Sequence, residues 1–148
     1  MPIDLKKIRI SSYLMNSLTG GDESYHNICR LKLDLEDRNH RQKLLQFLNK
    51  WGCRQFAHYD HASASRGIAR WYNNYKRTLP NAASQLLELR DSQIKRFANL
   101  FDNLKTVRAS TDEKGREKTV GPVGAAKILF AVRRHVFSPW DGNIIKGE

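Results

Sequence analysis

The sequence predicts an all-α fold, a compact bundle of about five or six helices, and three observations support this prediction. The chain has 148 residues, which is the usual size of a single domain. Apolar residues recur at intervals of three and four in several stretches, as expected of helices that bury one face. Only four prolines occur, and three of them lie at apparent segment edges. We therefore expect residues 1–148 to form one helical domain.

The first half of the chain contains two well-marked helices. Residues 1–22 mix apolar and charged positions, and we expect a short N-terminal segment that docks on the body of the domain. Residues 31–35 alternate apolar and charged side chains, but the run is too short to require a strand. We expect irregular structure or a helix start there. Helices are predicted over residues 39–51 and 63–79, and Pro80 ends the second.

The second half predicts three further helices and one loop. Residues 81–90 predict a short helix and residues 92–104 a longer one with apolar residues on one face. Residues 108–119 are almost entirely polar, and we expect a mobile polar loop. A last apolar helix is predicted from Gly124 to Val136, as part of a C-terminal helix-hairpin-helix-like element.

The net charge of the chain is +11, and this excess is unevenly distributed. Residues 1–60 contribute +3, whereas residues 61–148 contribute +8. A basic excess of this size favours a polyanionic partner, with nucleic acid as the default. A solvated helical surface is the alternative interpretation.

Several classes of protein are excluded by composition. Two cysteines, Cys29 and Cys53, are too few for a disulfide scaffold or a four-cysteine zinc site. No stretch approaches the roughly 18–20 consecutive apolar residues of a membrane span. The N-terminus lacks the apolar core of a signal peptide. We therefore expect a cytoplasmic protein without a membrane partner.

One cluster of possible metal ligands occurs, at His58, Asp60 and His61, with Cys53 nearby. A metal site needs three or four ligands, and a polar loop is the favoured interpretation of this cluster. The sequence contains no phosphate-binding loop and no zinc-protease or nucleophile-elbow motif. We therefore expect no metal and no cofactor.

The most informative stretch runs from Val120 to Lys127. Glycine just before a helix allows a tight turn and leaves the first amide N–H groups of the helix open. Together with the helix dipole, these groups can bind a phosphate. An ordinary turn into a core helix is the alternative. The anion-binding candidates in this stretch are Gly121, Val123, Gly124, Ala125 and Lys127.

Further basic residues are candidates for phosphate contacts. Arg133 and Arg134 lie near the end of the last helix, where they either stabilise its negative dipole end or contact phosphates. Lys118 precedes the glycine stretch. Arg66 and Arg70, together with Lys76 and Arg77, lie among aromatic residues. Such a mixture either stacks bases and holds phosphates or forms a core bordered by exposed arginines. The aromatic residues concerned are Trp71, Tyr72 and Tyr75.

Residues 120–144 combine a glycine hairpin, a small-residue helix start, a helix and a Pro-x-Asp sequence. This combination resembles the helix-hairpin-helix DNA glycosylases, and it is also similar to uncharacterised bacterial domains with an Ala-Ala-Lys start and a Phe-x-Pro-x-Trp-Asp end. The resemblance implies that amides around Gly124 grip DNA phosphates and that Asp141 acts at a flipped nucleotide. Pro122 stands where the family usually has glycine, and Lys127 lies one residue after the position of its nucleophilic lysine.

These observations predict a protein that binds nucleic acid, with duplex DNA favoured over RNA. Two alternatives stay open. One is a base-excision DNA glycosylase or glycosylase/lyase, with Asp141 and Lys127 as the catalytic candidates. The other is a non-enzymatic subunit or interaction module of a ribonucleoprotein or phage assembly. The sequence leaves open whether the protein is an enzyme.

Overall fold

A computed structural model of the chain describes residues 23–56 and 60–139. The described residues form five α-helices, one 3₁₀ turn and one two-stranded hairpin, which confirms the mostly helical fold class. The elements in chain order are α2 (Glu23–Arg30), α3 (Arg38–Lys50), α4 (His61–Tyr75), η2 (Leu86–Glu88), α5 (Asp91–Lys105), β1 (Arg108–Thr111), β2 (Glu117–Thr119) and α6 (Gly121–Val132). The expected docking of residues 1–22 lies outside the described residues.

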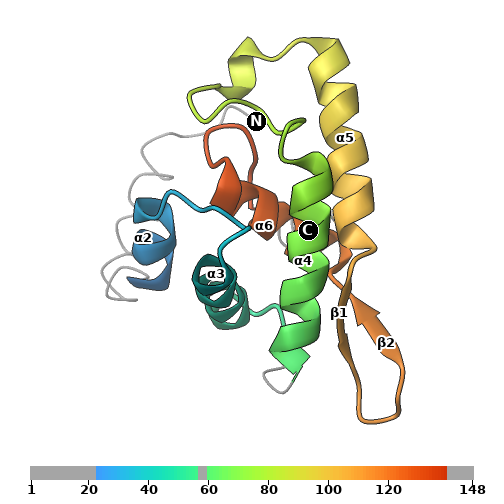
Figure 1. The fold of residues 1–148 in the computed structure, drawn as a ribbon. Coiled ribbons are helices and arrows are strands. Elements are labelled where there is room, and N and C mark those ends of the chain that lie inside the picture. Colours follow the sequence, from blue (N-terminus) through green and yellow to red (C-terminus); the bar gives the residue numbers. More distant parts are fainter. Residues whose placement is uncertain (1–22, 57–59, 140–148) are drawn as a thin grey trace, which may run out of the picture.

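Helix α6 occupies the middle of the bundle (Figure 1). It packs against α3 and α5, and every residue from Gly124 to Phe130 is buried. A helix that is apolar on all sides must be enclosed on all sides, so the sequence of α6 itself dictates this central place. Helix α6 ends at Val132, earlier than the predicted Val136, because the backbone of Arg133 leaves the helical region at φ −143°.

Helix α3 begins one residue before the predicted cap. The side chain of Asp37 accepts a hydrogen bond from the Asn39 amide at 2.7 Å, which satisfies one of the free donors of the first turn. Leu44, Leu45, Phe47 and Leu48 then face the core. Gly52, with φ +77°, turns the chain away after the helix, as expected of a C-terminal glycine.

The alternating run at residues 31–35 is irregular, one of the two outcomes that the sequence allows. Leu33 and Leu35 are buried, whereas Lys32 and Asp34 are exposed. An extended chain that lies along the core produces this pattern without a partner strand. Helix α2, which precedes this run, was not predicted from the sequence, because it buries only Ile28.

Residues 108–119 are a correction to the sequence analysis, because they form an antiparallel hairpin and not a loop. Arg108 pairs with Thr119, and Thr111 pairs with Glu117, with one irregularity between the two pairs. The buried side of the hairpin consists of only Ala109 and Ser110. Two small buried residues give almost no apolar signal in the sequence, which is why a polar loop was expected.

The predicted helix over residues 81–90 is also wrong, apart from the single turn of η2. Two of the leucines on which that prediction relied do not reach the core, since Leu86 is 55% exposed and Leu87 is 96% exposed. Leu89, which is partly buried, does pack against the core. The Asn81 side chain accepts from the Ala83 amide at 3.2 Å, and this local turn competes with a helix.

The expected helix-hairpin-helix-like element is not confirmed. Strand β2, rather than a helix, comes directly before Val120, and Gly121 is already the first residue of α6. The glycine stretch is therefore the first turn of the central helix and not a loop between two helices.

Candidate nucleic-acid interface

The predicted hairpin glycine, Gly124, lies inside α6 and is buried. A Cβ atom at this position would lie 2.8 Å from Nε2 of Gln55 and 3.3 Å from Cε2 of Phe56. Close packing therefore accounts for this glycine. Ala125 is fully buried, while Gly121 and Val123 are partly exposed. Gly124 and Ala125 are buried inside the protein, so a phosphate in solvent does not reach their amides in this structure. The predicted phosphate contacts therefore do not fit these two residues.

Lys127 is likewise placed in the interior, and its predicted catalytic and phosphate-binding roles do not fit that position. The residue is 8% exposed, and its Nζ donates to the Trp51 carbonyl oxygen at 2.6 Å. The same Nζ lies 5.6 Å from the centre of the Trp51 ring, within range of a cation–π interaction. Lys127 thus ties α6 to the end of α3.

Arg133 and Arg134 connect the end of α6 to other parts of the chain. Nε of Arg133 donates to the Pro80 carbonyl oxygen at 2.6 Å, and its Nη1 donates to Val132 O at 2.8 Å. Arg134, which is exposed, donates to the carbonyl oxygen of Cys29. These contacts favour a structural role for both arginines over the predicted phosphate contacts.

The aromatic residues of α4 belong to the core. Trp71 and Tyr72 are 3% and 8% exposed, and Nε1 of Trp71 donates to Leu100 O at 3.3 Å. Burial raises the pKa of the Tyr72 hydroxyl, and the nearby Asp34 carboxylate adds to this effect. Of the two interpretations of this segment, the structure favours a core bordered by exposed arginines.

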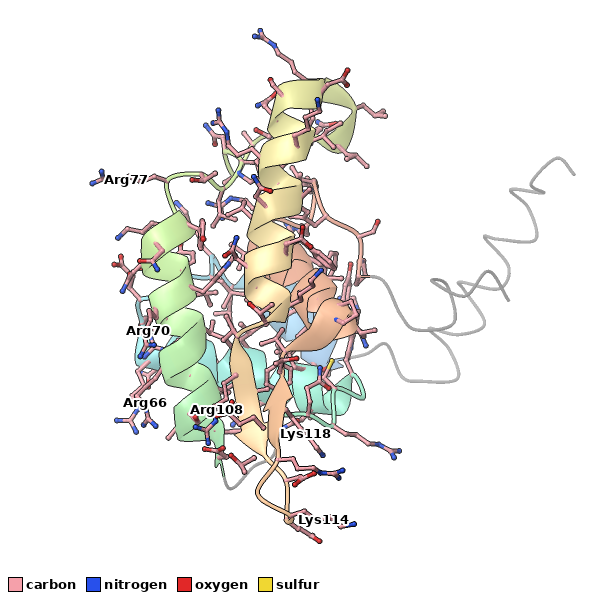
Figure 2. All side chains as sticks on the ribbon, turned by 90° about the vertical axis from the view of Figure 1, so that its right-hand side faces the viewer. Arg66, Arg70, Arg77, Arg108, Lys114 and Lys118 are labelled. Atoms are coloured by element: carbon pink, nitrogen blue, oxygen red, sulfur yellow. The ribbon has the colours of Figure 1, made fainter. Side chains whose placement is uncertain are left out.

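Three arginines form a stripe on the outer side of α4. Arg66 and Arg70 are one turn apart, and Arg77 follows just beyond the end of the helix. At about 100° per residue, positions separated by four and eleven residues lie on nearly the same side of a helix. Figure 2 shows the three side chains pointing to the same side of the molecule. The sequence analysis singled out the first two.

The hairpin carries its own cations next to this stripe. Arg116 pairs with Asp112 at 2.8 Å, and Arg108 lies 3.3 Å from Glu117 and 3.9 Å from Asp60. Lys114 and Lys118 are exposed, and no carboxylate of the described residues lies within 4 Å of either ammonium group. In Figure 2 the two lysines lie on the hairpin, to the right of Arg66 and Arg70 and below them, with Arg108 between Arg66 and Lys118.

We call these five side chains the basic face. They are Arg66, Arg70, Arg77, Lys114 and Lys118. All five are exposed, and within residues 23–56 and 60–139 none has an ion-pair partner. The sequence analysis named Arg77 only as a neighbour of the aromatic residues, and it missed Lys114. The signal for Lys114 is the Asp112-x-x-Gly115 pattern around it, which is typical of a tight turn.

Close packing fixes the hairpin against α4. Gly67 faces β1 so tightly that a Cβ atom would lie 2.7 Å from Cγ1 of Val107. The hydroxyl of Ser110 donates to Gln55 O at 2.6 Å, and the Thr111 amide donates to Oδ2 of Asp60 at 3.1 Å. The cations of the hairpin and those of α4 are therefore held in a fixed relation.

The remaining candidates do not form a site in the described part of the chain. Asp141, on which the base-excision alternative depends, and His58 lie outside it. His61 lies 2.8 Å from Asn49, nitrogen to nitrogen. No group of three or more histidine, cysteine or acidic residues able to hold a metal occurs among the residues described. None of the described helices has the length and hydropathy needed to cross a membrane.

Comparisons of the chain with protein-family models, with curated proteins and with solved structures found no match.

Proposed function

We propose that the protein binds nucleic acid through the basic face, with duplex DNA as the preferred form. The observation that carries this proposal is the set of five exposed cations without a carboxylate partner among the described residues. Binding of phosphates by such groups releases condensed counterions from the nucleic acid, which is the main source of affinity in non-specific complexes.

The dimensions of the arginine stripe suit a duplex. Eleven residues separate Arg66 from Arg77, which corresponds to about 16 Å along a helix. The major groove of B-form DNA is about 12 Å wide. The two ends of the stripe can therefore contact phosphates on both strands.

The hairpin favours DNA over RNA. It projects from the body of the molecule beside α4 (Figure 1), and all three residues of β2 are exposed. A two-stranded ribbon fits the major groove of B-form DNA, whereas the major groove of A-form RNA is too narrow for side chains to read. Glu113, exposed at the tip, suits a groove contact, since a carboxylate accepts a hydrogen bond from cytosine.

The test is the salt dependence of binding to a short fluorescein-labelled DNA duplex, followed by anisotropy. For the double variant Arg66→Gln/Arg70→Gln, the slope of log affinity against log salt concentration should fall by about 1.8, since each lost phosphate contact removes about 0.9. The matched control is Lys43→Gln/Lys50→Gln. It removes the same amount of charge, but from the side of α3 that faces α2 and not from α4. Its slope should equal that of the wild type.

Two outcomes would contradict the proposal. If both double variants lower the slope equally, only net charge matters and the basic face has no special role. If the wild-type protein shows no affinity at low salt, it does not bind DNA. Competition by an RNA duplex of the same sequence measures the preference: stronger competition by RNA than by unlabelled DNA would instead favour the ribonucleoprotein alternative.

A further inference from the structure

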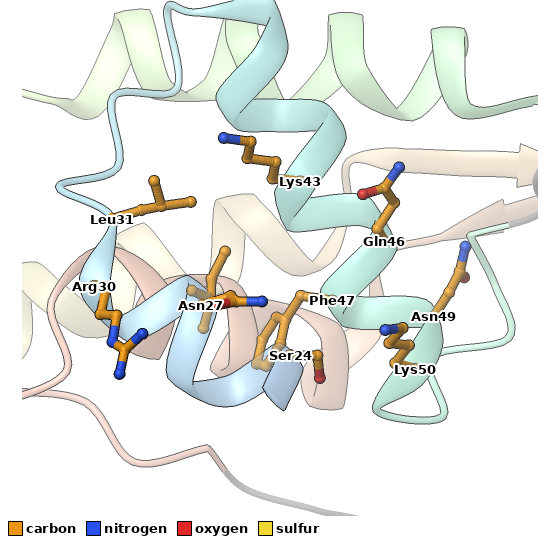
Figure 3. Close-up of a pocket in the computed structure, with 10 residues that line it drawn as sticks. Ser24, Asn27, Arg30, Leu31, Lys43, Gln46, Phe47, Asn49 and Lys50 are labelled. Carbon is orange, nitrogen blue, oxygen red and sulfur yellow. The ribbon is translucent and has the colours of Figure 1, made fainter. Parts of the chain in front are cut away.

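A groove of about 700 Å³ runs between α2 and α3 (Figure 3). It lies on the side of α3 that faces away from α4 and the hairpin (Figure 1). The basic face therefore does not extend into it. We call this feature the α2–α3 groove.

The floor of the groove is apolar and its rim is cationic. Ile28 and Phe47, each 2% exposed, and the partly exposed Leu31 form the floor. Arg30, Lys43 and Lys50 are exposed at the rim. Figure 3 places these three cations around the apolar centre and not together at one end.

Within the described part of the chain, the cations of the rim have no carboxylate partner. Of residues 23–56 and 60–139, no acidic residue lines the groove and none has its carboxylate within 4 Å of the cationic group of Arg30, Lys43 or Lys50. An occupant that matches this surface must therefore supply negative charges on several sides of an apolar group.

We propose that the α2–α3 groove binds an acidic amphipathic helix of a partner protein. Such a segment places apolar residues on one side and carboxylates beside them, as in other complexes in which a helix occupies a groove. From Lys43 to Lys50 the groove extends for about 10 Å along α3, or roughly two helical turns. Leucine-sized side chains of the partner contact the floor, and its Asp or Glu side chains pair with the rim.

Other occupants match the groove less well. A nucleic-acid backbone has no apolar group for the floor, and an amphiphile with a single carboxylate would leave two of the three cations unpaired. The chain's own residues 1–22 contain three basic residues, Lys6, Lys7 and Arg9, against Asp4 and Asp22. That segment is itself net positive and would face like charges at the rim.

The experiment uses the full-length chain and a synthetic fluorescein-labelled peptide of about three helical turns, with leucines on one side and glutamates elsewhere. Anisotropy should show binding that weakens with salt, and amide chemical-shift changes on addition of the peptide should localise to α2 and α3. Lys43→Gln/Lys50→Gln should weaken binding by about fivefold, since exposed ion pairs contribute modestly. Arg66→Gln/Arg70→Gln, with the same net charge, should bind like the wild type.

A second variant, Gln46→Glu, adds a negative charge at the groove and should weaken peptide binding in the same direction. The proposal is overturned if the peptide does not bind, which is also the result expected when residues 1–22 fill the groove. It is equally overturned if a peptide with lysines in place of the glutamates binds with the same affinity, or if both double variants lose the same affinity for the peptide.

A loss of DNA affinity in Lys43→Gln/Lys50→Gln would instead assign the groove to nucleic acid. The peptide measurement does not depend on whether the basic face binds DNA.

Discussion

At the scale of single residues, two lysines with the same expected role have opposite surroundings. The sequence made Lys118 and Lys127 joint candidates for phosphate contacts. The structure leaves Lys118 exposed without an ion-pair partner among the described residues, whereas Nζ of Lys127 is buried against Trp51. Burial depends on which elements enclose a helix, and the local sequence around a lysine does not contain that information.

The two lysines should therefore differ in what their removal changes. Lys127→Ala loses a buried stem and a charged hydrogen bond, and it should lower the free energy of unfolding by about 2–4 kcal/mol. Lys118→Ala, at an exposed position, should change stability by less than about 0.5 kcal/mol. Urea denaturation measures both. A destabilisation of equal size in the two variants would mean that Lys127 is not held in the core.

A second residue-scale feature is Asp112 in the turn of the hairpin. Its carboxylate accepts from the amides of Arg116 and Lys114, each at 2.9 Å, and from Nε of Arg116 at 2.9 Å. The amide hydrogen bond from Arg116 is the main reason why the pKa of Asp112 lies below its ordinary value of 3.8. Each of these donors stabilises the ionised form of the carboxyl.

The lowered pKa of Asp112 determines how the stability of the turn depends on pH. The turn gains stability from Asp112 above the carboxyl's unfolded pKa, and it loses that gain as the pH falls through the lower folded pKa. The amide signals of Lys114 and Arg116 should therefore move together in an NMR titration, with a midpoint below 3.8. In Asp112→Asn this titration step should be missing. A midpoint above 3.8 in the wild type would contradict the hydrogen bonding described for the turn.

At the scale of elements, the position of the hairpin depends on Gly67. Replacing glycine by alanine in a helix normally stabilises it by about 0.5–1 kcal/mol. In Gly67→Ala the new Cβ atom would lie 2.7 Å from Cγ1 of Val107 and 3.3 Å from Arg108 O. Overpacking of this kind costs about 1–3 kcal/mol, so we expect net destabilisation in place of the usual gain.

The double variant Gly67→Ala/Val107→Ala tests this explanation, because it removes the Cγ1 atom that the new methyl group would meet. A thermodynamic cycle from urea denaturation should show that the double variant is more stable than the sum of the two single changes. Additive effects would show that the two residues do not limit the approach of α4 and β1.

The same elements show where sequence analysis succeeds and where it stops. Helices α3 and α5 were predicted nearly to their ends, because their apolar residues recur at helical intervals and face the core. The hairpin and η2 were not. The buried side of β1 consists of two small residues, and the leucines of η2 are apolar but exposed. Both failures arise because apolar content was used as a substitute for burial.

At the scale of the whole molecule, the chain has a net charge of +11, and two of its basic surfaces differ in chemistry. The basic face combines arginines and lysines with no apolar component, and it is suited to phosphates. The α2–α3 groove combines three cations with an apolar floor. The sequence indicated that charge concentrates in the second half of the chain, but the groove uses residues of the first half. Only the folded arrangement of α2 and α3 brings those residues together.

The central place of α6 also has a consequence for the order of events during synthesis. Chains leave the ribosome N-terminal end first, and segments fold as their partners become available. Helices α2 to α5 and the hairpin are made before residues 121–132, yet α3 and α5 both pack on α6. Their apolar surfaces stay open until the last of the described helices emerges. The core of the growing chain therefore closes only when α6 is available to pack between α3 and α5.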